Sequence, residues 1–353
     1  MIALDSNSVE SREKGQLTVS QITAGMESRL VPMVTQILRI IKDISGRAEN
    51  LSVNDLAEFI SGEPTTLGRI VSIASSVGYN STGIEISSIH HAISLIGFER
   101  IRTLAISVLL FESAQSDYMA EANRELAGQA LVSGLVAAEI CRRGAAADPE
   151  MAFICGVMRE YGRMLAATFL PGDYAETARL GTHTDADEAF AAVFGISQLD
   201  LGRQMLEGMN VPKLILNSFV SLPPHARRNS TANSAIGLIA ASDFGLRVAR
   251  LLQASDLTSD NFESRLESLS REYDASFLLT GTATRELLDH LVSMIGSFKP
   301  RAGSYVGSVG VFRRLDCLAC ERALPLPSVV VFSPASSRPR SVTELEESGC
   351  YEI

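Results

Sequence analysis

Three groups of residues in this chain have types and spacings that could do chemistry, and the first is an acidic cluster. The segment GTHTDADEAF, residues 181–190, places His183, Asp185, Asp187 and Glu188 within six residues. Imidazole and carboxylate groups are metal ligands, so the cluster could hold a divalent cation. The same spacing fits a helix start that Thr184 caps, with acids favoured in the first turn by the helix dipole. We favour the capping interpretation.

The second group is the pair Cys317 and Cys320 in the sequence CLAC. This spacing is typical of half a zinc site or of a redox pair. No second pair or nearby histidine completes a tetrahedral set, and Cys350 is distant. A three-cysteine site or a zinc-dependent dimerisation element in the tail stays open as an alternative. Cys141 and Cys155 lie in apolar helical sequence, which predicts small buried side chains.

The third group is a charge pair inside an apolar helix pattern. In FICGVMREYGRM, Phe153, Val157 and Met164 recur at the spacing of a buried helical face, and Arg159 and Glu160 interrupt it. The five histidines give no better candidate, because His90 and His91 are adjacent and point in different directions on a helix. No glycine-rich phosphate loop is present. The residues alone therefore indicate an all-α protein without an evident active site.

The elements that would position these residues are helices along most of the chain. The pattern predicts a flexible leader over 1–24, a helical unit over 25–118, a second helical bundle over 119–299 and an irregular tail over 300–353, with a short strand at 329–332. Two helices of the first unit meet at Gly97. In the second unit we expect helices at 123–143, 149–169, 171–180, 185–194, 198–208, 231–252, 261–272 and 283–298.

Composition limits the function classes. The chain has 353 residues, 46% of them hydrophobic, and a net charge of −10 with a pI near 5.1. An acidic protein is a poor general nucleic-acid binder, because binding phosphates needs a basic face. Five scattered cysteines do not make a disulfide framework. The polar N-terminus and the shortness of the longest apolar run, which ends at Phe111, predict a cytoplasmic protein with no membrane contact.

The first 250 residues contain motifs that resemble the HDOD domain of bacterial signalling proteins. They are a helix with a leading proline, the segment SVNDLAEFISGEPTTLGRIVSIASS and the helix pair around ISSIHHAISLIGFER. Glu63 stands where the family has Asp before Pro64. The matching positions are Pro32, Leu56, Ala57, Ile60, Pro64, Leu67, Ile70, Ser75, Ile89, Ala92, Ile93, Ile96 and Gly97.

The resemblance implies a relation to the HD phosphohydrolases, whose metal site uses histidines and an adjacent His-Asp pair. Here Arg159 stands for that histidine and Glu160 for the aspartate, while Val132 and Gln198 occupy two further histidine places. A guanidinium has no acceptor with which to bind a cation. We therefore interpret the Arg-Glu pair as a relic of the metal site, formed by two surface-leaning or mutually paired charges. Alternatively, Arg159 receives a phosphate or carboxylate.

The function that follows from the resemblance is a non-catalytic bacterial signal-transduction module without a metal or cofactor. It would bind a protein partner or a small effector, with Val132, Arg159, Glu160, Gln198 and Asp243 lining the former metal pocket. The expected fold is all-α, two packed helical bundles of which the second resembles a degenerate HD domain. The alternative is a divergent metal-dependent phosphohydrolase whose site is rebuilt from Glu160 and from the acidic cluster of His183, Asp185 and Asp187.

Overall fold

The described part of the chain is helical, as the sequence predicts. The computed structural model describes residues 6–28, 64–75, 80, 84, 86, 88–113, 120–144, 147–181, 185–207, 211–229, 234–302 and 304–323, and these residues contain no strand. The helices are α1 (Ser6–Ser28), α4 (Pro64–Ala74), α5 (Ile89–Ile96), α6 (Phe98–Ser113), α7 (Ala120–Arg142), α8 (Pro149–Met158), α9 (Tyr161–Phe169), α10 (Pro171–Leu180), α11 (Ala186–Phe194), α12 (Gln198–Glu207), α13 (Lys213–Asn217), α14 (Pro224–Arg228), α15 (Ser234–Leu251), α16 (Ser259–Ser270), α17 (Thr282–Ala302) and α18 (Gly310–Ala323), with 3₁₀ turns η1 (Ala275–Phe277) and η2 (Ser304–Ser308).

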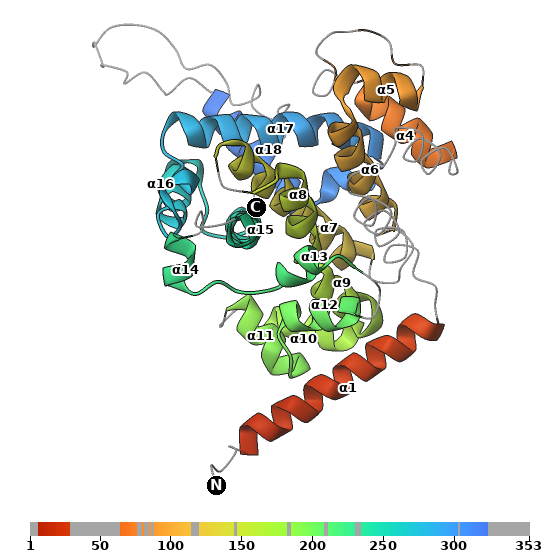
Figure 1. The fold of residues 1–353 in the computed structure, drawn as a ribbon, viewed down its shortest axis with the longest axis vertical. Helices are drawn as coiled ribbons and strands as arrows, with labels where there is room; N and C mark the ends of the chain where they lie inside the picture. The colour runs from red at the N-terminus through yellow and green to blue at the C-terminus, as the bar shows by residue number, and fades with distance from the viewer. Residues whose placement is uncertain are drawn as a thin grey trace, which may run out of the picture.

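The centre of the molecule is a set of three helices, α7, α8 and α15, packed against one another (Figure 1). Glycines let these helices approach closely. A Cβ placed on Gly245 of α15 would lie 2.2 Å from the carbonyl oxygen of Ser133 in α7, and one on Gly156 of α8 would lie 2.8 Å from the Cα of Gly134. Because no side chain separates the backbones at these crossings, residues on the facing surfaces are fully buried.

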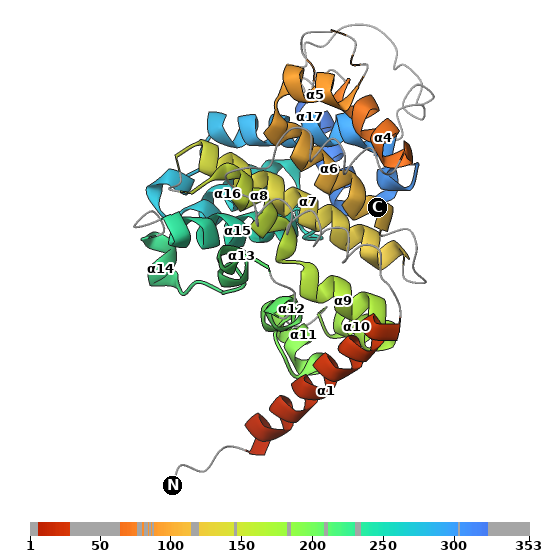
Figure 2. The ribbon, with the colours of Figure 1, turned by 45° about the vertical axis from the view of Figure 1, so that its right-hand side comes forward.

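The predicted helix at 149–169 is divided in two. Asp148 caps α8, with Pro149 in the first turn, but the helix ends at Met158. Arg159 and Glu160 form a turn from which α9 starts in a new direction, as Figure 2 shows. The charge pair thus lies at the corner between two helices, where successive side chains can take different surroundings.

The predicted flexible leader over 1–24 is wrong for residues 6–24, because residues 6–28 form α1. This helix packs along α9, α11 and α12 (Figure 2). Ile22 is fully buried, and the hydroxyl of Thr18 donates to the carbonyl of Phe194 at 2.8 Å. Few apolar residues are needed for this docking, since polar side chains of α1 reach carbonyls at the end of α11 that lack a partner within that helix. Composition alone therefore misrepresents the segment.

The first helical unit is described from α4 onward. As predicted, α5 and α6 meet at Gly97, whose φ of 95° favours glycine. The hydroxyl of Ser88 accepts a hydrogen bond from the amide of His91 and caps α5. Helix α17 packs on α4, α6 and α7, so it joins the two helical units. The all-α fold class is confirmed, whereas the domain boundaries stay a prediction.

The predicted irregular tail is wrong for residues 300–323. Helix α17 continues to Ala302, and after η2 the chain forms α18. Leu315 and Leu318 of α18 are buried, which explains why this segment is ordered as a helix. The strand predicted at 329–332 lies outside the described residues. No helix among those described has the length and apolarity that crossing a membrane requires.

Candidate functional site

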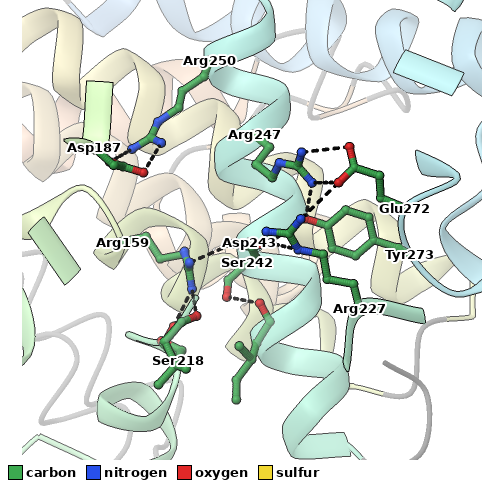
Figure 3. Close-up of polar contacts among 12 residues, drawn as sticks. Arg159, Asp187, Ser218, Arg227, Ser242, Asp243, Arg247, Arg250, Glu272 and Tyr273 are labelled. Atoms are coloured by element: carbon green, nitrogen blue, oxygen red, sulfur yellow. Dashed lines mark hydrogen bonds and ion pairs between the residues drawn. The ribbon is translucent and has the colours of Figure 1, made fainter. Parts of the chain in front are cut away.

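Arg159 is the centre of a buried polar network. Its side chain is 1% exposed. One guanidinium nitrogen donates to the carbonyls of Ser218, at 2.5 Å, and Val220, at 3.2 Å, and the other donates to the carboxylate of Asp243 at 2.9 Å (Figure 3). Burial lowers the pKa of Arg159, and the charge of Asp243 acts against that effect. The interpretation of Arg159 as surface-leaning or paired with Glu160 is therefore wrong: its partner is Asp243 of α15.

Asp243 is also bound on its other side. Its second oxygen accepts a hydrogen bond from the hydroxyl of Tyr273 at 2.6 Å and lies 3.4 Å from the Nε of Arg227. Burial, with the neighbouring carboxylate, raises the pKa of Tyr273, which keeps the phenol protonated as a donor. Both oxygens of Asp243 are thus engaged by the protein's own donors.

A second carboxylate, Glu272, closes the network toward the surface. It accepts hydrogen bonds from Arg247 at 2.7 and 2.9 Å and from Arg227 at 3.1 Å, as the right of Figure 3 shows. Both guanidinium groups also lie beside the ring of Tyr273, 5.7 and 5.8 Å from its centroid. The hydrogen bonds from Arg247 hold the pKa of Glu272 below its usual range. This arrangement ties α14, α15 and the end of α16 together.

The described residues of the acidic cluster, Asp185, Asp187 and Glu188, do not form a metal site with one another or with other described residues. The two oxygens of Asp187 accept hydrogen bonds from Arg250 at 2.7 and 2.8 Å, and Arg163 lies 3.5 Å away. The cluster does begin a helix, but the cap is Asp185, whose carboxylate accepts from the amide of Asp187, in place of the predicted Thr184. His183 lies outside the described residues.

The remaining predicted pocket residues are buried without joining the Arg159 network. Val132 and Glu160 are fully buried, and Gln198 is 1% exposed. Neither the carboxylate of Glu160 nor the amide of Gln198 has a hydrogen-bond partner within the described part of the chain. Burial acts to lower the pKa of Arg250. The hydrogen bonds to Asp187 and the negative charges of Glu160 and Asp187 outweigh the effect of burial, so the pKa of Arg250 is raised.

The side chains of Arg159, Val132 and Asp243 do not form a set of ligands for a divalent metal ion. Arg159 offers only donors, Val132 offers no ligand atom, and Asp243 is already engaged. Among the residues that the structure describes, no three His, Cys, Asp or Glu side chains are placed to hold a metal together. The guanidinium of Arg159 is itself the cation here, held by one carboxylate and two carbonyls.

Sequence reasoning found Arg159 and Asp243 but missed the groups around them. The carbonyls of Ser218 and Val220 leave no signal in the sequence. A signal did exist for Arg247 and Arg250, because they follow Asp243 by four and seven residues and so share one face of α15. That face carries the polar network.

A family model of the HDOD domain matches residues 30–221 of this chain. The chain belongs to the HDOD domain family. The resemblance drawn from the sequence is therefore confirmed. The matched segment includes Arg159 and Glu160 but ends before Asp243, so the anion that binds Arg159 comes from a helix beyond it.

Solved structures share the fold. An HDOD protein of unknown function from Geobacter sulfurreducens is 15% identical, with a TM-score of 0.60 over 83% of this chain and 98% of that one. A presumed phosphohydrolase from Shewanella amazonensis is 15% identical, with a TM-score of 0.53 over 80% and 93%. A presumed signal transduction protein from Marinobacter aquaeolei is 19% identical, with a TM-score of 0.50 over 92% and 67%. No curated protein matches the chain.

Proposed function

We propose that this HDOD chain is a non-catalytic signal-transduction module of the bacterial cytoplasm that acts by binding a protein partner or a small effector. The observation that carries the proposal is the internal ligation of Arg159 by Asp243, Ser218 and Val220. Hydrolysis of a phosphoester by the HD-type mechanism needs a metal-activated water. A buried guanidinium at the histidine position repels a metal ion and supplies no ligand for it.

A protein partner is favoured by the surface next to the network. Arg159 fixes the backbone from Ser218 to Val220, which connects α13 to α14. This segment exposes the side chain of Val220, which is 39% exposed, and Leu214 of the adjoining helix α13 is 40% exposed. Apolar side chains displayed from a fixed backbone are suited to the centre of a protein interface, because little conformational entropy is lost on binding. We place the partner's contact there.

The alternative is a divergent metal-dependent phosphohydrolase with a rebuilt site. One observation favours it, namely the buried carboxylate of Glu160, whose oxygens accept no hydrogen bond from the described residues. A metal at Glu160 would need further ligands from residues such as His183 that the structure does not describe. The Shewanella protein is named as a phosphohydrolase, but its similarity to this chain shows a common fold alone and is no evidence for that activity here.

Metal content and hydrolysis decide between the two functions. The purified chain is incubated with Mn²⁺, Fe²⁺ or Mg²⁺, its bound metal is measured by plasma mass spectrometry, and turnover of bis(p-nitrophenyl) phosphate is followed. Glu160→Gln and Asp187→Asn are the variants, and circular dichroism checks that they fold. We expect no stoichiometric metal and no metal-dependent turnover in any sample. Stoichiometric metal and hydrolysis that are both lost in Glu160→Gln would overturn the proposal.

The partner surface is tested by site-specific photocrosslinking in the cells that naturally make the chain. A photoreactive amino acid replaces Leu214 or Val220, and Leu180 of α10, which is also 40% exposed, is the matched control. We expect a discrete adduct from positions 214 and 220 and none from position 180. Equal adducts from all three positions, or none from the first two, would contradict this assignment.

A further inference from the structure

Cys317 and Cys320 lie side by side on the exposed face of α18. Both are exposed, whereas Leu318 between them is buried. Residues three apart in an α-helix lie nearly above one another, with Cβ atoms about 5–6 Å apart. A single ion can therefore contact both sulfur atoms without any change in the backbone.

The helix that carries them is fixed to the body of the molecule. Phe312, Leu315 and Leu318 are buried in the core. The amide of Gly310 at the start of α18 donates to both oxygens of Glu125, at 2.8 and 2.9 Å, and Asp316 pairs with Lys299 of α17. The two thiols thus project from a rigid element, so binding a ligand costs little ordering of the chain.

The other two described cysteines have different surroundings. Cys141 and Cys155 are buried, and burial raises the pKa of each thiol to about 12. They stay protonated near neutral pH, and little of either side chain is in contact with solvent. Of the described cysteines, only the exposed pair is accessible to a metal ion.

We propose that Cys317 and Cys320 form half of a four-thiolate site for a thiophilic divalent cation such as Zn²⁺, completed by the same pair from a second copy of this chain. Structural zinc sites are tetrahedral with four protein ligands, and thiolates are among the preferred ones. No third His, Cys, Asp or Glu within the described part of the chain joins the two sulfurs. A twofold axis between two copies of α18 supplies the missing pair with identical geometry.

The binding step is a ligand exchange without electron transfer. Four thiols lose their protons, and the four sulfur lone pairs replace the water molecules of one Zn²⁺ ion. Each ion therefore releases four protons and joins two chains, and a chelator with protons from the buffer reverses the step. The product carries a net negative charge, which the exposed Arg313, one turn before Cys317, helps to offset.

The test is a titration of the reduced, metal-free full chain with Zn²⁺, with mass measured by light scattering and bound metal by plasma mass spectrometry. Co²⁺ is a parallel probe, because tetrahedral thiolate coordination gives it intense visible absorption. We expect one ion per two chains, a doubling of the mass, and reversal by EDTA. Zinc binding and the doubling of the mass should both be lost in Cys317→Ser and in Cys320→Ser, and both should be retained in Cys350→Ser.

Several results would overturn the proposal. They are an absence of zinc binding, one ion bound per monomeric chain, or doubling that persists in Cys317→Ser and Cys320→Ser. Loss of binding in Cys350→Ser would assign the metal to a three-cysteine site within one chain and would equally reject the shared site. Circular dichroism is not expected to change in the serine variants, since both side chains are exposed.

Discussion

The guanidinium of Arg159 and the carboxylate of Asp243 form an ion pair at 2.9 Å in which the side chains are 1% and 6% exposed. The pair joins the end of α8 to α15, and the same guanidinium holds the backbone between α13 and α14. Charges this deeply buried are tolerated only when each finds opposite charge and hydrogen bonds. Arg159 meets both conditions, so the pair is a structural link between helices that are distant in sequence.

Replacing Arg159 by methionine should destabilise the fold strongly. The variant deprives one oxygen of the buried Asp243 of its guanidinium partner, although Tyr273 and Arg227 still contact the other oxygen, and it removes the donor to the carbonyls of Ser218 and Val220. Breaking a buried ion pair on one side costs about 3–5 kcal/mol of unfolding free energy. Urea denaturation measures the loss.

The matched control is Arg203→Met, because Arg203 forms an exposed pair with Glu207, 42% and 50% exposed. That change should cost no more than about 0.5 kcal/mol. The double variant Arg159→Met with Asp243→Asn should lose less unfolding free energy than the sum of the two single variants. Each substitution removes the buried charge that the other substitution leaves unpaired. Equal losses for Arg159→Met and Arg203→Met would show that the buried pair has no special role.

The stability of the chain should depend on pH through Glu272. The hydrogen bonds from Arg247 lower the pKa of Glu272 in the folded state. In the unfolded chain the pKa of a glutamate is about 4.3, so the folded state binds a proton at Glu272 less readily. The stabilisation is therefore present above that value and is lost as pH falls through the folded pKa. Glu272→Gln should be less stable than the native chain at pH 7, with a difference that shrinks below about pH 5.

Urea unfolding at a series of pH values measures this difference. Arg247→Met should remove most of the same pH-dependent component, because it deletes two of the three hydrogen bonds to Glu272 and leaves the one from Arg227. A difference between native chain and Glu272→Gln that stays constant from neutral to acidic pH would show that the carboxylate charge is not involved.

The helices and the family could be predicted from sequence because their signals are local. The caps Ser88 and Asp148, the turn at Gly97 and the apolar spacing of α8 all depend on neighbours in the chain. The docking of α1 could not be predicted, since it depends on carbonyls of Phe194 and Gly195, far away in sequence. The helical nature of residues 300–323 was missed for the same reason, as tertiary packing decides it.

The candidate site was predicted only in part. Its key residues, Arg159 and Asp243, are recognisable by type, but their pairing joins positions 84 residues apart. Burying a charge such as that of Arg159 ordinarily carries a large cost in free energy. That cost is offset here by two backbone carbonyls, which have no sequence signature.

The cysteines should separate into two classes when a thiol reagent is added to the native chain. Cys317 and Cys320 are exposed, whereas burial raises the pKa of Cys141 and Cys155 to about 12. The experiment uses the Cys350→Ser variant, so that only these four thiols are counted. The thiolate is the reactive form, so two thiols should react with Ellman's reagent in the native chain and two more only in denaturant. Fast reaction of three or four thiols without denaturant would contradict the described burial.

Substitution of Gly15 by alanine should release α1 from the rest of the molecule. A Cβ at this position would lie 2.7 Å from the carbonyl oxygen of Gly195, and Gly195 is itself held at a φ of 69°. Alanine favours the helical state over glycine by about 1 kcal/mol, so α1 stays helical while its docking is blocked. Hydrogen exchange should then show faster exchange over residues 6–28 and unchanged protection in α7, α8 and α15.

Gly68→Ala is the control, because a Cβ there meets nothing within 4 Å, and it should leave exchange in α1 unchanged. Retained protection of α1 in Gly15→Ala would mean that the contact between Gly15 and Gly195 does not hold the helix in place.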